Sequence, residues 1–169
     1  MSEYSSRGFF DADNKLIMIV KIKLEHPKAK KPEIQHSTDA GADLYAARIA
    51  KKNIFSIWYG TGFKSQIPRG WYGKIVPRSS ISKMGLTLVN SPGTVDSNFR
   101  GEWQIRFNYT VKGFLLKLFT FGIVDKSYEA GDRVAQVIID KKPEVEFRTA
   151  KRLTKTAREE GGFGSTNKK

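Results

Sequence analysis

The sequence contains no cysteine and only two histidines, His26 and His36. A chain without cysteine forms no disulfide and no thiolate metal site, and two histidines are too few for a histidine-rich metal centre. Long apolar runs are also missing. The most apolar stretch, residues 114–124, is interrupted by Lys117 and Gly122, whereas a membrane-spanning helix needs roughly 20 apolar residues. The sequence therefore predicts a protein that makes no contact with a membrane.

Acidic residues are scarce relative to basic ones: 17 Asp and Glu stand against 30 Lys and Arg, a formal net charge of +13. This excess favours polyanionic partners such as nucleotides or nucleic acid, although many basic chains simply carry a solvated surface. The chain of 169 residues, 39% hydrophobic and 28% charged, has the length and composition of one soluble globular domain. Glu3, Asp11 and Asp13 precede the first apolar run, which is not typical of a signal peptide. We expect an intracellular, soluble protein, in the cytoplasm or nucleus of the host cell.

Short strand-like segments between turn signals dominate the chain and predict an all-β sandwich, jelly roll or barrel. The first, 16–24, alternates in a way that allows burial on both faces. The others are 54–59, 63–67, 73–76, 86–89, 103–111, 114–124 and 133–140. Helix signals are weak, at 81–84 and 149–153. We expect a loose leader over 1–14, a β domain over 15–156 and a flexible C-terminal arm over 157–169.

The arm carries the first candidate site. In the segment Arg158-Glu-Glu-Gly-Gly-Phe-Gly-Ser-Thr166, the glycines allow backbone N–H groups to converge on a phosphate, and Arg158 adds a fork-shaped cation. Phe163 has little core to join there and is better interpreted as a lid that stacks on a base. The alternative, a linker end, fits the glycines but not the accompanying Arg, Phe, Ser and Thr.

Two further segments carry polar groups at turns. The segment 77–80, Pro-Arg-Ser-Ser, brings a guanidinium, two hydroxyls and turn amides together as a second anion cradle, although most such segments are ordinary turns. The segment 86–96 predicts a hairpin whose turn contains Asn90. Asn90 can read a base edge or simply shape the turn, and Asp96 can activate a water or be a surface carboxylate.

Together these segments resemble the trimeric dUTPase family, whose five ordered motifs extend here from Thr38 to Thr166. The motifs are 39–47 (DAGADLYAA), 73–80 (GKIVPRSS), 90–101 (NSPGTVDSNFRG), 131–136 (GDRVAQ) and 158–166 (REEGGFGST). The resemblance implies a jelly-roll-like β fold and a homotrimer with active sites shared between subunits. It also implies a dUTP pyrophosphatase that uses Mg2+, forms dUMP and pyrophosphate, limits uracil incorporation into DNA and supplies dUMP for dTMP synthesis.

The resemblance also assigns roles to individual residues. Asp96 matches the carboxylate that activates water for attack on the α-phosphorus. Asn90, with the backbone of Gly93, Thr94 and Val95, matches the group that recognises uracil. Phe99 stands where an aromatic residue, usually Tyr, packs under the deoxyribose. Four residues match phosphate contacts: Arg78, Ser79, Ser80 and Gln136. The closing arm is matched by Arg158, Phe163, Gly164, Ser165 and Thr166. Gln104 matches a further contact, and Asp43 matches an aspartate that is structural or touches metal-bound water.

The chain departs from the commoner pattern at Phe99, at Ser80 in place of Gly, and at Glu159 and Asn167 in the arm, and none of these changes removes a group that the mechanism needs. The loop between the third and fourth motifs is longer than usual and apolar. We expect an extended hairpin there, buried locally or at a subunit contact, with a partner-binding surface as the alternative.

The sequence leaves two rival functions to weigh. The related dCTP deaminase family shares the spacing of residues 78–86, but it has Arg where this chain has Lys83, and its catalytic Glu would fall near Arg106, which cannot act as a base. A nucleic-acid-binding or regulatory protein would explain the charge of +13 and the basic tail. The complete motif set makes nucleic acid the less favoured partner.

Overall fold

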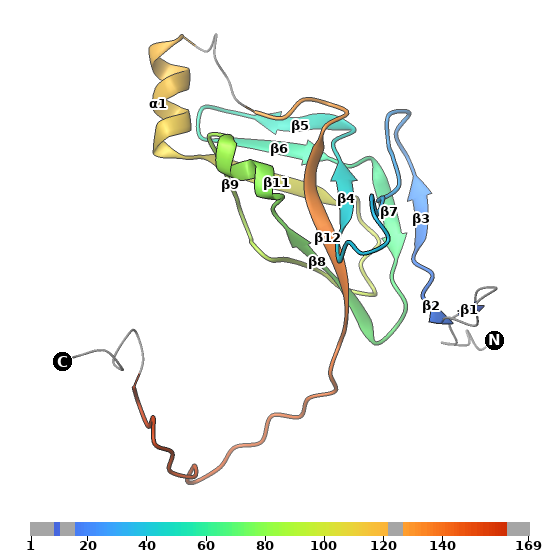
Figure 1. The fold of residues 1–169 in the computed structure, drawn as a ribbon, viewed down its shortest axis with the longest axis vertical. Helices are drawn as coiled ribbons and strands as arrows, with labels where there is room; N and C mark the ends of the chain where they lie inside the picture. Colours follow the sequence, from blue (N-terminus) through green and yellow to red (C-terminus); the bar gives the residue numbers. More distant parts are fainter. Residues whose placement is uncertain (1–8, 11–15, 122–126, 162–169) are drawn as a thin grey trace.

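The computed structural model describes residues 9–10, 16–121 and 127–161, and it consists mainly of strands (Figure 1). One four-stranded sheet has the order β10-β8-β12-β4, and a second has the order β5-β6-β11-β9. The first is built from β10 (Gly93–Val95), β8 (Trp71–Val76), β12 (Arg133–Lys141) and β4 (Ala42–Tyr45). The second is built from β5 (Arg48–Lys52), β6 (Ser56–Gly60), β11 (Gln104–Tyr109) and β9 (Leu86–Leu88). All described pairings are antiparallel.

Alternation along the strands supplies the hydrophobic core between the sheets. On β11, Ile105 and Phe107 are buried, while Gln104, Arg106 and Asn108 are exposed on the other face. Strand β6 contributes Ile57 and Tyr59, and the aromatic rings of Tyr59 and Phe107 meet edge to face at 5.8 Å. The remaining fully buried large side chains include Leu44, Phe63 and Val134. This arrangement confirms the all-β, jelly-roll-like fold.

The segment expected as one strand over 16–24 is divided into two short strands. β2 (Leu16–Ile17) pairs with β1 (Phe9–Phe10), so the leader is not wholly irregular, and β3 (Lys21–Leu24) pairs with β7 (Phe63–Gln66). The expectation of burial on both faces is wrong for β3 within this chain, because only Ile22 is partly covered. The lysines that alternate with the apolar residues keep one face in solvent.

Residues 86–96 form the expected turn, but not a two-stranded hairpin. Strand β9 pairs with β11 in one sheet, and β10 pairs with β8 in the other, so the turn connects the two sheets. The expected helical turn near 81–84 is present as the short 3-10 helix η1 (Ser79–Lys83). No helix forms at 149–153, where the chain is extended and exposed.

The long apolar loop is a helix, α1 (Val111–Phe119), and the predicted extended hairpin is wrong. Thr110 caps it, because its Oγ1 accepts a hydrogen bond from the N–H of Gly113 at 3.1 Å. One side docks onto the body: Phe114 stacks on Phe55 at 5.9 Å. Apolar residues fill most positions of this run and show no clear period, so the sequence did not distinguish helix from strand here.

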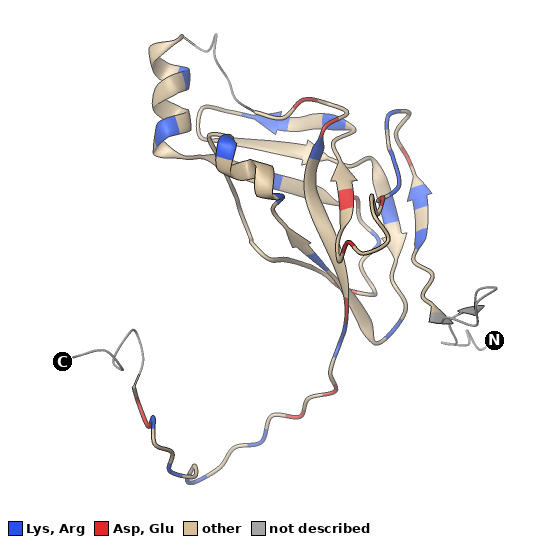
Figure 2. Cartoon of the chain, viewed as in Figure 1, with Lys and Arg blue, Asp and Glu red and all other residues tan. Residues whose placement is uncertain are grey.

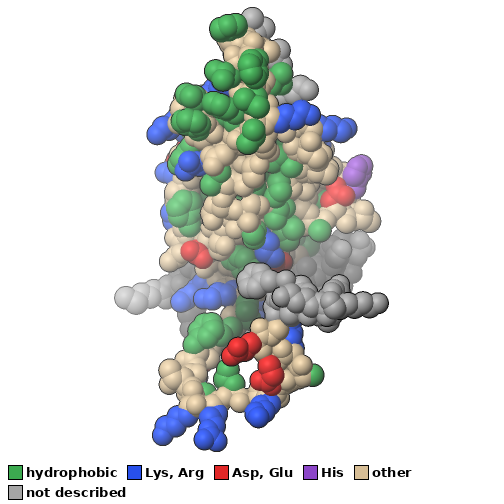
Figure 3. All heavy atoms as spheres, turned by 90° about the vertical axis from the view of Figure 1, so that its left-hand side faces the viewer, with side chains coloured by type: hydrophobic (Ala, Val, Ile, Leu, Met, Phe, Trp, Pro, Cys, Tyr) green, Lys and Arg blue, Asp and Glu red, His purple; other side chains and the backbone are tan. Residues whose placement is uncertain are grey.

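The opposite side of α1 leaves apolar side chains uncovered by this chain. They gather at one end of the molecule (Figure 3) and belong to Val111, Leu115, Leu118 and Phe119, followed by Phe121. Beyond β12, residues 142–161 run away from the sheets as an extended segment (Figure 1). None of the helices in the described part of the chain is long and apolar enough to cross a membrane.

Candidate active site

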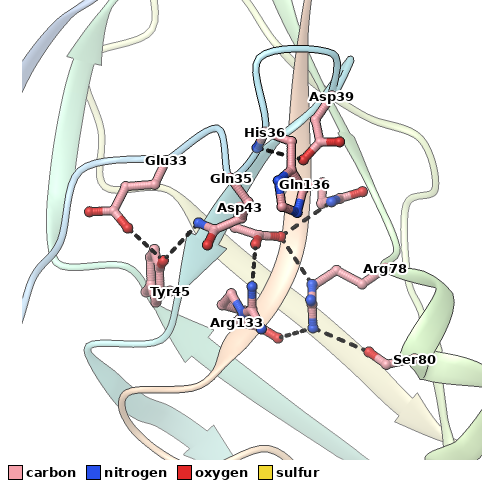
Figure 4. Close-up of polar contacts among 10 residues, drawn as sticks. All are labelled: Glu33, Gln35, His36, Asp39, Asp43, Tyr45, Arg78, Ser80, Arg133 and Gln136. Atoms are coloured by element: carbon pink, nitrogen blue, oxygen red, sulfur yellow. Dashed lines mark hydrogen bonds and ion pairs between the residues drawn. The ribbon is translucent and has the colours of Figure 1, made fainter.

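A buried carboxylate, Asp43 on β4, lies at the centre of the most connected polar cluster (Figure 4). Its Oδ1 accepts hydrogen bonds from Nε of Arg78 at 3.0 Å and from the side-chain amide of Gln136 at 3.2 Å. Its Oδ2 accepts from a guanidinium nitrogen of Arg133 at 3.1 Å. A carboxylate that is only 2% exposed needs such partners, because burial penalises an unpaired charge.

Three strands bring these partners together. Gln136 on β12 lies opposite Asp43 in the ladder between β12 and β4, and opposite Val76 in the ladder between β12 and β8. Arg78 lies two residues after the end of β8 and immediately before η1, and its side chain reaches Asp43 at the same end of the sheet. Residues far apart in sequence therefore converge because their strands are neighbours.

The cluster keeps an excess of positive charge. One carboxylate faces the two guanidinium groups of Arg78 and Arg133, and the second guanidinium nitrogen of Arg78 reaches the Ser80 hydroxyl at 3.3 Å. Arg78 and Arg133 remain 22% and 43% exposed. The buried Asp43 carboxylate orients both guanidinium groups, and part of each group stays exposed to solvent. Such a pair of cations is suited to bind phosphate oxygens. Along the backbone in Figure 2, one acidic position lies on β4, and basic positions lie on β5 of the other sheet.

Beside the cluster, Tyr45 is the last residue of β4 and contacts the loop that precedes this strand. Its hydroxyl donates to the Glu33 carboxylate at 2.7 Å, and this bond, assisted by burial, raises the pKa of Tyr45 above its usual value. The ammonium group of Lys30 lies over the same ring at 4.8 Å. These contacts hold the loop before β4 against the strand that carries Asp43.

A pocket of about 570 Å³ is the second feature of the site. It contains every residue that the sequence assigned to the base, the sugar and the attacking water. These residues are Asn90, Gly93, Thr94, Val95, Asp96 and Phe99, and Gln104, the expected further contact, lines the same pocket. The pocket is continued by the outer face of the second sheet, where the guanidinium of Arg106 lies 5.0 Å from the ring of Trp58.

In the turn between β9 and β10, the backbone conformation favours the residues that occupy it, Asn90 and Gly93. Asn90 adopts a positive φ of 54°, which Asn tolerates better than most residues. A Cβ on Gly93 would lie 3.1 Å from the carbonyl oxygen of Asn90, so the absence of a side chain allows the close approach. The amide of Asn90 therefore lies beside the backbone of β10 in one compact arrangement.

Two residues that sequence reasoning missed support these features. Arg133 lies in the fourth motif, and only its contact with Asp43 marks it as part of the cluster. Glu102, on the pocket wall, forms a two-pronged ion pair with Arg48, with both N–O distances 2.6 Å. This bond, and a lesser one from the N–H of Gly62, lowers the pKa of the Glu102 carboxyl. The two partners are 54 residues apart, so local spacing carried no signal.

Within one chain the expected site is divided. Arg78, Ser80 and Gln136 belong to the Asp43 cluster, and Ser79 stands next to them at the start of η1, whereas none of these four lines the pocket. Arg158 lies on the extended arm, where its Nε donates to the carbonyl of Gly161 at 2.7 Å. The other arm residues assigned to the site, Phe163, Gly164, Ser165 and Thr166, lie outside the described residues.

The described side chains do not form a protein cage for a metal. Within residues 9–10, 16–121 and 127–161, no three His, Asp or Glu side chains are grouped so that they could hold an ion. Asp43 already accepts three hydrogen bonds, which leaves capacity on Oδ2 for one further donor. This arrangement fits a hydrated cation that is held by a phosphate ligand better than one held directly by the chain.

Comparisons with known proteins agree on one family. The dUTPase family model matches residues 27–167. The deoxyuridine 5'-triphosphate nucleotidohydrolase of Rhizobium meliloti is 41% identical over 145 residues, which cover 82% of this chain and 83% of the relative. A variant of the Staphylococcus bacteriophage 80alpha dUTPase with dUpNHpp superposes with a TM-score of 0.70 at 22% identity, covering 88% and 98% of the two chains. A variant dUTPase of the S. aureus phage phi11, which coordinates a structural Mg(II) ion, has a TM-score of 0.62 at 21% identity, with coverage of 80% and 98%.

Proposed function

The chain belongs to the dUTPase family and is a dUTP nucleotidohydrolase, and from this premise we propose how its residues divide the work of forming dUMP and pyrophosphate. The pocket receives the nucleoside, the Asp43 cluster receives the phosphates, and the arm closes over both. The observation that carries this assignment is the gathering of Asn90, Asp96 and Phe99 around one pocket of nucleoside size.

Asp96 is assigned the role of general base. Its carboxylate is exposed at the pocket, and no hydrogen bond or ion pair engages it in the part of the chain that is described. A free carboxylate can take a proton from a water as the water oxygen attacks the α-phosphorus. The bond between the α-phosphorus and its bridging oxygen to the β-phosphorus breaks, and pyrophosphate leaves.

Specificity for dUTP is assigned to the turn and to Phe99. The Asn90 amide can both donate to and accept from a uracil edge, and the backbone of Gly93, Thr94 and Val95 narrows the space beside it. Phe99 lies at the same pocket, where its ring would be in contact with a deoxyribose and would exclude a 2'-hydroxyl. Gln104 adds a polar group on the adjoining wall.

The phosphates are assigned to the Asp43 cluster. Arg78 and Gln136 are already oriented by the carboxylate, and the hydroxyls of Ser79 and Ser80 stand at the start of η1. We propose Mg2+ as the cofactor, carried mainly by the triphosphate and touching Asp43 through water. When bound there, it neutralises phosphate charge and orients the leaving pyrophosphate. The phage phi11 relative with its structural Mg(II) ion supports a role for this metal in the family.

A homotrimer is the proposed assembly, with each site shared between subunits. The separation of the pocket from the phosphate cluster, and of both from Arg158, supports this proposal. An intracellular location, in cytoplasm or nucleus, fits an enzyme whose substrate belongs to the deoxynucleotide pool. Further roles that fit the product and substrate are a supply of dUMP and a lower incorporation of uracil into DNA.

The test is a pyrophosphate-release assay with dUTP, dTTP, dCTP and UTP on the wild-type enzyme and the Asp96→Asn variant. We expect turnover of dUTP alone, and a loss of most of kcat in the variant with its dUTP affinity retained, since only activation of the water is removed. Near-wild-type turnover by Asp96→Asn would show that another group is the base. Comparable kcat/KM values on UTP or dTTP would refute the assignment of specificity to the turn and Phe99.

The rival functions make different predictions for this assay. A dCTP deaminase would release ammonia from dCTP, but the position of its acid–base residue is held here by Arg106, whose guanidinium lies over Trp58. A nucleic-acid-binding protein would show salt-dependent binding to DNA or RNA without turnover. The dUTPase family model, which matches residues 27–167, accounts for the motifs without either alternative.

A further inference from the structure

The segment that carries Asp96 and Phe99 has little regular structure to hold it. Strand β10 ends at Val95 and β11 begins at Gln104, so the residues between them belong to no strand. One turn hydrogen bond, from the N–H of Phe99 to the carbonyl of Asp96 at 3.1 Å, closes the first part. The position of the Asp96 carboxylate therefore depends on how the backbone of this segment is fixed.

Arg100 supplies that fixation from within the segment. One of its terminal guanidinium nitrogens donates to the carbonyl of Ser97 at 2.7 Å and to the carbonyl of Phe99 at 2.8 Å. The same nitrogen lies 3.5 Å from the carbonyl of Ser65 on β7. A planar cation is well suited to collect several carbonyl oxygens, because its donors are rigidly oriented and always charged.

The anchor point on β7 is itself immobilised. Ser65 is 4% exposed, and its hydroxyl accepts a hydrogen bond from the indole N–H of Trp103 at 3.1 Å. Its backbone lies opposite Ile22 in the ladder between β3 and β7. Arg100 thus connects the exposed segment to a buried part of the fold.

Phe99 depends on the same local geometry. A Cβ on Gly101 would lie 2.5 Å from Cζ of Phe99, so the ring lies directly over the glycine. The ring position and the backbone of residues 97–99 are therefore set together. A shift of this backbone would move the aromatic ring and the preceding carboxylate at once.

We propose that Arg100 is a positioning residue for dUTP hydrolysis, whose guanidinium holds residues 96–99 so that the Asp96 carboxylate and the Phe99 ring keep their places at the pocket. This inference rests on the proposed roles of Asp96 and Phe99. Arg100 does not line the pocket and is not among the residues assigned to contact the substrate. Its loss should misplace a catalytic group and a sugar-sensing ring, and misplacement by about 1 Å can reduce the rate roughly 100-fold.

The experiment compares Arg100→Ala and Arg100→Lys with the matched control Arg69→Ala. Arg69 is an exposed arginine in the turn before β8, and its removal changes the net charge by the same amount. For Arg100→Ala we expect kcat on dUTP to fall roughly 10- to 100-fold while KM changes little. We also expect the ratio of kcat/KM for dUTP to that for UTP to fall, because Phe99 no longer excludes the 2'-hydroxyl. Arg100→Lys should lie between wild type and Arg100→Ala.

Added guanidinium ion at millimolar, non-denaturing concentration provides a second readout. It should restore part of kcat in Arg100→Ala and leave Arg69→Ala unchanged, an effect that a general loss of folding would not produce. If Arg100→Ala does not fold, Arg100→Lys decides: a reduced dUTP-to-UTP ratio supports the proposal, and a wild-type ratio overturns it. A folded Arg100→Ala enzyme with the kcat and ratio of the control also overturns it.

The outcome is separable from the proposed function. A wild-type enzyme that releases no pyrophosphate from dUTP would refute the function itself. An active wild type with an inactive Asp96→Asn and a fully active Arg100→Ala would leave the function standing and remove only the role of Arg100.

Discussion

The carboxylate of Asp43 and the guanidinium of Arg78 lie 3.0 Å apart, although 35 residues separate them in the chain. Asp43 also binds Arg133 and Gln136, so one buried carboxylate orients three donors that point toward the same end of the sheet. Neutralising part of the positive charge allows two guanidinium groups to stand close together, while their exposed sides remain available to an anion.

We predict that Asp43→Asn weakens both stability and phosphate binding. The amide cannot accept from Arg78, Arg133 and Gln136 as a carboxylate does, so the two cations repel each other. Because both arginines are partly exposed and screened by solvent, we expect a loss of about 1–3 kcal/mol in the free energy of unfolding rather than the value for a dry ion pair. Urea denaturation and KM for dUTP are the measurements. The control is Asp39→Asn, which removes an exposed carboxylate that caps a loop N–H.

Asp43 also shows what the sequence could and could not reveal. Its motif was visible, but its two possible roles remained open because the partners come from β8 and β12, which only the sheet order brings to β4. Asn90, Asp96 and Phe99, which the sequence assigned to one site from a single segment, line one pocket. The split of 86–96 between two sheets depends on long-range pairing, which local turn chemistry does not encode.

We predict a pH-dependent stability term from the pair formed by Glu102 and Arg48. The hydrogen bonds from Arg48 lower the pKa of Glu102 below its ordinary value of 4.5. A carboxylate with a depressed pKa in the folded state stabilises the fold above its unfolded-state pKa, and this contribution disappears as the pH falls through the folded-state pKa. Glu102→Gln should therefore be less stable than wild type at pH 7, and the difference should vanish in acid.

Denaturant titrations of wild type and Glu102→Gln at a series of pH values test this. Glu146→Gln is the matched control, because Glu146 forms a similar pair with Arg148 at 2.7 Å but both side chains are at least 70% exposed. Its removal should leave the free energy of unfolding nearly unchanged at every pH, because solvent screens an exposed pair. A stability difference for Glu102→Gln that does not change with pH would argue against the ion pair as its source.

We predict that Gly113→Ala detaches α1 from the body. A Cβ at this position would lie 2.2 Å from the carbonyl oxygen of Gly85, which is backbone and cannot move aside easily. The expected cost is about 1–3 kcal/mol, the usual scale of overpacking. Lys112→Ala, a substitution at an exposed position on the same helix, should cost much less. Thermal unfolding of the two variants provides the comparison, and equal melting temperatures would show that the contact with Gly85 is not needed.

The position of the arm bears on whether sites are shared between subunits. Residues 142–161 leave the sheets, and Arg158 reaches neither the pocket nor the Asp43 cluster of its own chain. A chain truncated after Ala157 should keep its melting temperature and its oligomeric state in light scattering. Its kcat should fall at least ~10-fold, roughly the scale of one lost charge-assisted contact.

Mixing two impaired chains, Asp96→Asn and the truncated chain, then tests whose arm closes each site. If the arm of one subunit closes the pocket of another, a trimer formed from Asp96→Asn chains and truncated chains contains some sites with an intact Asp96 and an intact arm. Mixing the two variants under conditions that allow subunit exchange should therefore restore pyrophosphate release from dUTP, up to about the fraction of such sites that random assembly gives. The double variant, truncated and carrying Asp96→Asn, is the control, and mixing it with Asp96→Asn should restore nothing. If mixed trimers of the two single variants form but release pyrophosphate no faster than the unmixed variants, each arm serves its own subunit and the sites are not shared in this way.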